Sequence, residues 1–186
     1  MSGELYPDEE QRRRIMDFIM AAGETLLQNG AEVFRVEQTM EIMARSFHLR
    51  EFHVYVLTNG IFASAGTAEI SEVRNVPVRT THLGRVAAVN ELSRQIAAGG
   101  ITLDEAESRL VLAQRIPFPK GRVQLLAGMS GAFCFALIFG GTLRSGLVAA
   151  IAGLAASGYL LLCDRNNVPG GFKSISTAAF ITILCI

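Results

Sequence analysis

The hydrophobic pattern changes character along the chain, from periodic in the first part to continuous after about residue 116. Over residues 8–29, apolar side chains recur at spacings of three and four, which is typical of an amphipathic helix. Gly30 is placed to end this helix as a C′ glycine. The same spacing over residues 31–47 predicts a second helix, so the chain should begin with an antiparallel helical hairpin.

A strand signal follows in residues 52–57, which are rich in β-branched and aromatic side chains. Residues 58–60 read Thr-Asn-Gly and predict a tight turn, because an Asn-Gly pair readily adopts positive φ. Residues 61–65 are then the return strand, and residues 69–76 are expected to add a third strand. These segments predict a small antiparallel sheet.

Helical periodicity returns over residues 81–98, and a glycine pair ends it. Thr102 and Glu105 form a capping-box pattern that opens another helix, which should reach about Arg115. The predicted order is helix, helix, strands, helix, helix. We therefore expect an α+β domain over residues 1–116.

Charge is distributed very unevenly over the 186 residues, although 17 basic and 17 acidic residues balance overall. After Arg122 only four charged side chains remain, and these are Arg144, Asp164, Arg165 and Lys173. The change lies close to the segment 116–119, Ile-Pro-Phe-Pro, whose prolines cannot continue a helix. We place the domain boundary there and predict membrane helices over residues 117–186.

Two uncharged runs in this second part are long enough to cross a bilayer. They cover residues 123–143 and 145–163, and about 20 helical residues span the roughly 30 Å hydrocarbon core. A third run, residues 174–186, is too short to span, so it is either a partial span or the beginning of a span that these 186 residues do not complete. A buried hairpin of a soluble protein is the alternative interpretation.

Small residues recur at a spacing of four in both long runs, which favours close helix packing in lipid. The positions are Gly128, Ala132, Ala136 and Gly140 in the first run, and Ser145, Ala149, Gly153 and Ser157 in the second. Basic residues flank the two runs on one side, and only Arg144 lies in the link between them. The positive-inside rule then places residues 1–116 and the 164–173 loop in the cytoplasm.

Composition excludes several classes of protein. Half of the residues are hydrophobic, which argues against disorder, and the balanced charge argues against a nucleic-acid partner. Three cysteines, Cys134, Cys163 and Cys185, are too few for a disulfide scaffold and are expected to be free thiols. The three histidines show no metal-ligand spacing, and no catalytic signature is visible. We expect no metal, no cofactor and no enzyme activity.

Four short strings resemble signatures of the threonine/serine exporter family. Residues 30–39, GAEVFRVEQT, are similar to its GAE-x-[YF]-RVE-x-T block, and residues 58–61, TNGI, resemble the next block. Residues 90–94, NELSR, look like its VN-x-LSR helix, and residues 139–141 match its FGG. The strings occur in family order across about residues 15–165.

This resemblance implies a multi-pass efflux transporter of the bacterial cytoplasmic membrane with a cytoplasmic N-terminal domain. Some family members are one long chain of about ten spans, and others pair a longer subunit with a small membrane partner. Threonine, serine and, for the split type, dicarboxylates such as succinate are family substrates. The chain resembles the long subunit, so a small partner subunit or a homo-oligomer is expected beside the lipid bilayer.

Among the candidate site residues, Glu32, Arg35 and Glu37 lie within six helical positions. Glu32 and Arg35 can pair on one helix face, which makes either an ordinary solvated surface or a docking and gating patch. Asn59 is a further candidate, although turn geometry is the simpler role for it.

Further candidates lie later in the chain. Asn90 and Arg94 share a helix face, and Arg94 could hold a carboxylate from a substrate, from Glu32 or from Glu37. Arg144 is either an interfacial anchor or a guide for an anionic or zwitterionic substrate. The Gly140-Gly141 pair could leave backbone N–H groups free for a carboxylate.

Two functions remain open from the sequence. The first is an exporter, or exporter subunit, for small amino acids or a dicarboxylate. The second is a membrane-tethered regulatory or assembly module whose cytoplasmic domain binds a partner. Two small-residue faces favour the first, because a simple anchor does not need them.

Overall fold

The computed structural model describes residues 8–66, 70–76, 80–166 and 168–185. They form two compact units, one ending at Pro117 and one beginning at Phe118. The first unit holds α1 (Glu9–Gln28), α2 (Val33–Ser46), β1 (His53–Leu57), β2 (Gly60–Ala65), β3 (Ile70–Asn75), α3 (Leu83–Ala97) and α4 (Leu103–Gln114). The second holds α5 (Gly121–Ile138), α6 (Leu143–Arg165) and α7 (Gly170–Cys185). The described chain is mostly helical, as expected.

Helix α1 is the centre of the first unit. Asp8 caps it by accepting a hydrogen bond from the Gln11 backbone N–H at 2.8 Å. The sequence predicted one buried face, but side chains on nearly all sides of the middle turns are buried: Ile15, Met16, Phe18, Ile19, Met20, Ala22, Leu26 and Leu27. Gly23 lets α2 approach, because a Cβ there would lie 2.4 Å from the Met40 sulfur. The predicted apolar face is therefore buried, and it is wider than the spacing indicated, since only a stripe stays fully or partly exposed in the middle turns: Asp17, Ala21, Glu24 and Gln28.

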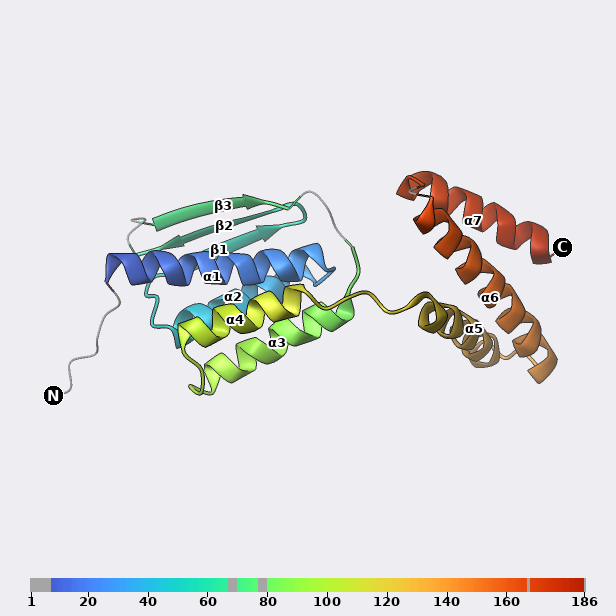
Figure 1. Ribbon diagram of the computed structural model, residues 1–186, viewed down its shortest axis with the longest axis horizontal. Coiled ribbons are helices and arrows are strands. Elements are labelled where there is room, and N and C mark those ends of the chain that lie inside the picture. Colours follow the sequence, from blue (N-terminus) through green and yellow to red (C-terminus); the bar gives the residue numbers. More distant parts are fainter. Residues whose placement is uncertain (1–7, 67–69, 77–79, 167, 186) are drawn as a thin grey trace. The chain divides into compact units, whose positions relative to one another are not determined.

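The three strands form one antiparallel sheet in the order β1-β2-β3, so the prediction of three strands is confirmed. Helices α1 to α4 all lie on the same side of the sheet, as Figure 1 shows. Side chains alternate between the two faces, and Val56, Ile61 and Ala63 are buried toward the helices. The remaining side chains of the strands lie on the opposite face of the sheet, away from the helices.

The turn between β1 and β2 differs from the prediction. Asn59 and Gly60 are absent from the described residues with positive φ, so the expected Asn-Gly geometry is wrong. The turn residues are Thr58 and Asn59, and Gly60 already pairs with Leu57 as the first residue of β2. Glycine suits position 60 for another reason, since a Cβ there would lie 3.2 Å from the Arg74 carbonyl oxygen on β3.

The carboxyl end of α1 closes on a glycine, as predicted. Gly30 has φ of 87°, and its N–H donates to the Leu27 carbonyl while the Ala31 N–H donates to the Leu26 carbonyl. This pair of bonds is a Schellman motif. The Thr80 and His82 backbone N–H groups also donate to carbonyls at this end, those of Gln28 and Asn29. The segment after the sheet is thereby fixed to the end of α1.

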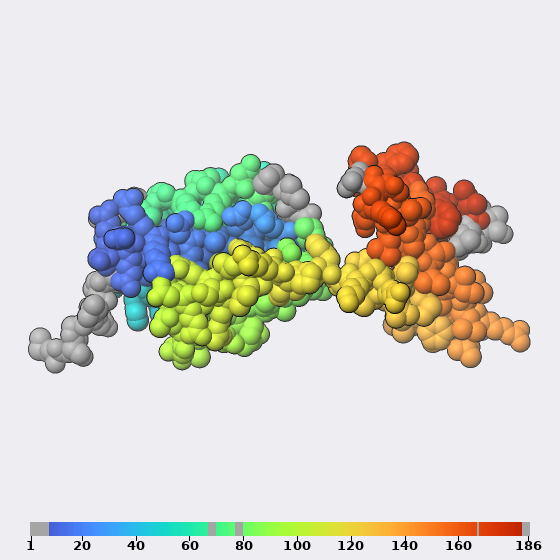
Figure 2. Space-filling view, viewed as in Figure 1, coloured from blue at the N-terminus to red at the C-terminus, as the bar shows by residue number. Residues whose placement is uncertain are grey.

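Helices α3 and α4 complete the layer. Thr102 caps α4, because its hydroxyl accepts from the Glu105 N–H at 3.4 Å, as the capping-box pattern predicted. The side chains of α1, α3 and α4 meet along one surface of the first unit (Figure 2). Ala106, Leu110 and Ala113 of α4 join the common core.

The second unit is three helices whose bounds differ from the predicted runs. Helix α5 ends at Ile138 instead of 143, because Gly140 (φ of 83°) and Gly141 form a Schellman motif with the helix end. Helix α6 covers 143–165 and is longer than predicted at both ends, and α7 begins four residues before position 174. Helices α5 and α6 are long and apolar enough to cross a membrane.

Candidate functional site

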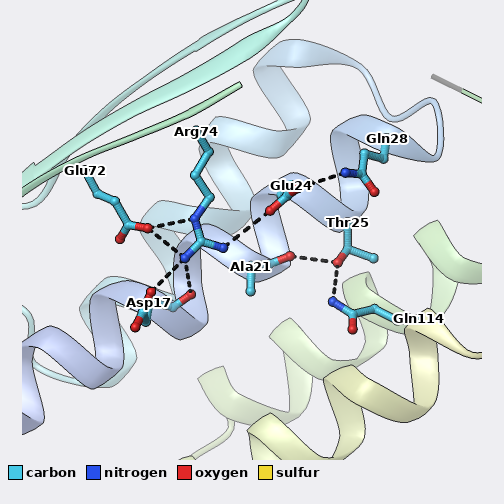
Figure 3. Close-up of polar contacts among 8 residues, drawn as sticks. All are labelled: Asp17, Ala21, Glu24, Thr25, Gln28, Glu72, Arg74 and Gln114. Atoms are coloured by element: carbon cyan, nitrogen blue, oxygen red, sulfur yellow. Dashed lines mark hydrogen bonds and ion pairs between the residues drawn. The ribbon is translucent and has the colours of Figure 1, made fainter. Parts of the chain in front are cut away.

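An arginine surrounded by carboxylates joins α1 to the edge strand β3 (Figure 3). Arg74 Nη2 lies 2.7 Å from Asp17 Oδ1, and its Nη1 lies 3.4 Å from Glu24 Oε2. Its Nε donates to Glu72 Oε1 at 2.7 Å. The Arg74 side chain is only 22% exposed, so these ion pairs are partly shielded from water. Pattern reasoning missed this cluster, because its members are up to 57 residues apart in sequence.

A second polar connection joins α1 to α4. Arg14 Nε donates to Glu107 Oε1 at 2.8 Å, and the guanidinium also pairs with Asp104. Hydrogen bonds to Glu107 and then to Asp104 raise the pKa of Arg14 above its ordinary value. Further along, Gln114 Nε2 donates to Thr25 Oγ1 at 2.9 Å (Figure 3). Both clusters hold α1 in place, and their arginines neutralise the carboxylates that a general acid or base would need.

The predicted charged patch on α2 is divided between two roles. Glu32 is the N-cap residue of α2 and pairs with Arg35 at 3.6 Å, with both side chains 66% exposed. Glu37 instead turns to the sheet, where its Oε1 accepts the Val56 N–H at 2.8 Å. The Glu37 carboxylate therefore accepts a hydrogen bond from a backbone N–H of the edge strand β1 that points away from β2. Glu37 is a structural tie, while Glu32 and Arg35 remain a solvent-facing pair.

The predicted partners of Arg94 are replaced by a local one. Arg94 Nη2 lies 2.6 Å from Glu91 Oε2 on the same helix, so the expected pairing with Glu32 or Glu37 does not form. Spacing of three on one helix makes this pair the nearest available. The hydrogen bond from Arg94 lowers the pKa of Glu91. Asn90 faces α2, where Thr39 Oγ1 lies 3.5 Å from its Oδ1.

A clamp on the exit of the chain from the first unit was also missed. The His82 Nδ1 atom accepts the Arg85 backbone N–H at 3.2 Å, which caps α3. Since Nδ1 accepts, Nε2 carries the ring proton and donates to the Pro117 carbonyl at 3.2 Å. Arg85 Nε donates to the Ile116 carbonyl at 3.0 Å. His82 is buried and both of its ring nitrogens have hydrogen-bond partners, so it is a structural histidine.

The contact between α5 and α6 is made by small residues. A Cβ on Gly128 would lie 1.8 Å from the Ser157 hydroxyl oxygen, and a Cβ on Gly153 would lie 2.6 Å from the Ala132 Cβ. A larger side chain at either glycine would force the two helices apart. Gly131, one turn along α5, has no described atom within 4 Å of its added Cβ. The close approach is therefore specific to one face.

The remaining predicted positions in this unit differ in their surroundings. Gly140 lies beyond the end of α5, with no described atom within 4 Å of an added Cβ, so it does not belong to the packing face. Ala136 and Ala149 are half-buried. The Gly140 and Gly141 N–H groups donate to Leu137 and Ala136 carbonyls, so the proposed free N–H groups for a carboxylate are absent. Arg144 is exposed in the first turn of α6.

The outward surface of these helices is apolar. Among the large hydrophobic side chains that are more than half exposed are Phe135, Ile138, Val148, Ile151, Phe172, Ile175 and Ile183. Cys134 is exposed and Cys163 is buried, and both are free thiols. The side chain of Cys185 lies outside the described residues. Across the part of the chain that the structure describes, His, Cys, Asp and Glu form no group of three that could hold a metal ion.

Comparison with known proteins gives two matches. A family profile described as putative threonine/serine exporter matches residues 17–186. A protein of Mycobacterium tuberculosis (strain ATCC 25618 / H37Rv), named probable threonine/serine exporter, is 25% identical over 184 residues. The alignment covers 96% of this chain and 35% of the relative, so the chain spans about a third of that protein's length. No solved structure matches.

Replacing the cation of the carboxylate cluster should destabilise the first unit. Arg74→Ala leaves Glu24 and Glu72 close together without a counter-charge, and we expect the free energy of unfolding to fall by about 1–2 kcal/mol. Urea titration of the detergent-solubilised chain, followed by circular dichroism, measures this change. The control is Arg13→Ala, which removes an exposed pair with Glu9 and should cost less than about 0.5 kcal/mol. If Arg74→Ala and Arg13→Ala lower the free energy of unfolding equally, a structural role for the cluster is contradicted.

Removing the histidine clamp should loosen the segment after α4. His82→Ala abolishes the bond to Pro117, so tryptic cleavage after Arg115 and Lys120 should become several times faster. His82→Asn tests the two bonds separately, because asparagine can still cap α3 but is too short to reach Pro117. Cleavage of this variant should be as fast as that of the His82→Ala variant. An exposed histidine, His53, changed to Ala should leave the rate unaltered. Slow cleavage in both His82 variants would refute the clamp.

The packing of α5 on α6 has a matched test. Gly128→Val should increase the distance between spin labels at Leu126 and Ile151 by about 2 Å, since interhelical distance follows the side chains at the contact. Electron–electron double resonance in lipid, on a chain freed of native cysteines, reads this distance. Gly131→Val makes the same substitution where nothing is in contact and should leave it unchanged. An unchanged distance in the Gly128 variant would rule out close packing there.

Proposed function

Because the chain belongs to the threonine/serine exporter family, we propose that it is part of a membrane transporter that carries small amino acids out of the cell. The chain spans about a third of the length of its relative. The pathway is therefore completed by further membrane segments, either of the same protein or of a small partner subunit. Threonine and serine are the first substrates to test, and a dicarboxylate such as succinate is the second.

The observation that carries this proposal is the α5–α6 pair. Its outer surface exposes large aliphatic and aromatic side chains, which lipid tails accommodate and water does not. Its inner contact is built from Gly128, Ala132, Gly153 and Ser157, and small residues are what allow helices to pack in a bilayer. A helix pair that is apolar outside and closely packed inside is suited to a multi-helix membrane protein.

The orientation we propose follows from the distribution of basic residues. Arg115, Lys120 and Arg122 precede α5, and Arg165 and Lys173 lie at the junction of α6 and α7. Only Arg144 lies at the opposite ends of α5 and α6. The positive-inside rule then puts the first unit and the α6–α7 junction in the cytoplasm, and Arg144 at the outer surface. There its guanidinium can attract the carboxylate of a departing amino acid.

The first unit has a mechanical part in this proposal. Its clamp, His82 and Arg85, holds the carbonyls of Ile116 and Pro117 just before the membrane helices begin. The clamp fixes the chain to the first unit up to Pro117, and residues 118–120 connect it to α5. Glu32 and Arg35, both exposed at the start of α2, are available to bind a further cytoplasmic element during transport.

Efflux from living cells tests the transport function with all natural components present. The chromosomal gene is edited to encode Gly128→Val or Gly131→Val, and cells are loaded with threonine from a threonine-containing dipeptide. We expect the Gly128 variant to lower the initial rate of threonine efflux about tenfold, because the α5–α6 packing is lost. The Gly131 variant should export like the parent.

Parallel loading with serine and succinate identifies the substrate class, since only true substrates should show the Gly128 effect. If cells that lack the gene export all three compounds as fast as parental cells do, export by this protein is refuted. The alternative, a membrane-tethered assembly module, is then the better proposal. Membrane immunoblots with equal amounts of both variants exclude loss of the protein as the cause of an effect.

A further inference from the structure

The face of the sheet turned away from α1 to α4 is here called the outer sheet face. Its members are His53, Tyr55, Leu57, Phe62, Ser64, Ser71, Val73 and Asn75. None of them is charged, although most of the charged residues of the chain precede Arg122. Along a strand with one solvated face, the side chains that point to the solvent are normally charged or strongly polar. An uncharged face with exposed aromatic rings is typical of a surface that another protein covers.

Two neighbouring rows on this face differ sharply in size. The strand register aligns Tyr55, Phe62 and Val73 in one row across all three strands, and their side chains are 64%, 44% and 65% exposed. The next row along the strands is His53, Ser64 and Ser71, two of which are small. A hollow of about 350 Å³ is lined by both rows and also by Val54, Ala63 and Glu72, the last of which is paired with Arg74. The face therefore carries a ridge with a hollow beside it.

A ridge beside a hollow is self-complementary. A two-fold axis that runs between the rows, at right angles to the strands, places the ridge of each molecule over the hollow of the other. Phe62 of each copy then lies over Ser64 of the second, and both contacts form at once, as an isologous interface requires. Two sheets stacked face to face at about 10 Å leave room for one interdigitated layer of side chains.

We propose that the outer sheet face is the interface between two copies of this chain. Charge favours this occupant, because a second copy brings another uncharged face and buries no unpaired ion. A lipid surface is disfavoured, since peripheral membrane binding relies on Lys or Arg beside the apolar side chains, and this face has neither. A strongly charged protein partner would leave its own charges without counter-charges.

The size of the face sets the conditions for pairing. Three strands of five or six residues cover about 300 Å² in plan, which is well below the roughly 800 Å² per partner of a stable soluble dimer. Confinement to a membrane raises the effective concentration of the copies, so a small interface is sufficient there. This step rests on the membrane location in the proposed function. The dimer should accordingly form in membranes and dissociate in dilute detergent.

Chemical cross-linking in native membranes tests the interface with the full chain. Two differently tagged copies, freed of native cysteines, are co-expressed with Phe62→Cys in one and Ser64→Cys in the other. A short bis-maleimide should join them at least about five times more efficiently than it joins Arg13→Cys to Ser64→Cys. Arg13 is exposed on α1, which lies on the other side of the sheet from the outer sheet face (Figure 1), and this makes it the matched control. Adding Tyr55→Ser and Val73→Ser, both exposed positions, should return the yield to the control level.

Three outcomes overturn the interface. The first is a yield for the Phe62–Ser64 pair that equals the control yield. The second is a cross-linked product whose mass corresponds to a different protein or a lipid adduct, without the two-copy product. The third is an unchanged yield after the Tyr55 and Val73 substitutions. Threonine efflux in the same cells separates the proposals, because normal efflux without cross-linking refutes the interface alone, and cross-linking without efflux refutes the exporter alone.

Discussion

The burial of α1 on nearly all of its sides is the constraint on which the first unit depends. A helix with Met16, Ile19, Met20 and Leu27 all fully buried cannot be covered by one partner, and it contacts β2, β3, α2, α3 and α4. At about 25 cal/mol per Å² of apolar surface, this shared burial is the main force that unites the layers. The ion pairs of Arg74 and Arg14 then fix α1 in register with β3 and α4, where they add orientation more than stability.

This core extends by backbone contacts to the exit of the chain. The Schellman end of α1 exposes carbonyls that accept from Thr80 and His82, and the His82 ring in turn binds Arg85 and Pro117. Asn29 and His82 are buried, so these contacts give their polar groups partners inside the protein. These bonds link α1 to Pro117, the last residue of the first unit.

The elements were predictable because hydrophobic spacing and caps are local properties. The period of α1 and α2, the β-branched run of β1 and the Thr102 cap all lie within a few residues of sequence. The predictions failed where distant partners compete. Arg94 pairs with Glu91 instead of Glu32, and Gly60 allows the approach of β3 instead of forming a left-handed turn. The Arg74 cluster joins two segments, α1 and β3, that no short motif connects. For the candidate site, the small-residue contact was visible as spacing, but the histidine clamp depends on tertiary structure alone.

Exposed apolar side chains gather on the membrane helices and on the outer sheet face, and the chemistry of each group indicates a different neighbour. On α5, α6 and α7 the exposed residues are long aliphatic and aromatic side chains over complete helix faces, and only lipid or further helices match such a surface. On the outer sheet face the exposed rings alternate with serine hydroxyls and an imidazole, which lipid tails cannot hydrogen-bond. That mixture of apolar ridge and polar hollow matches a protein interface instead. The surface suited to lipid and the surface proposed for a second copy thus differ in chemistry, and they belong to different units of the chain.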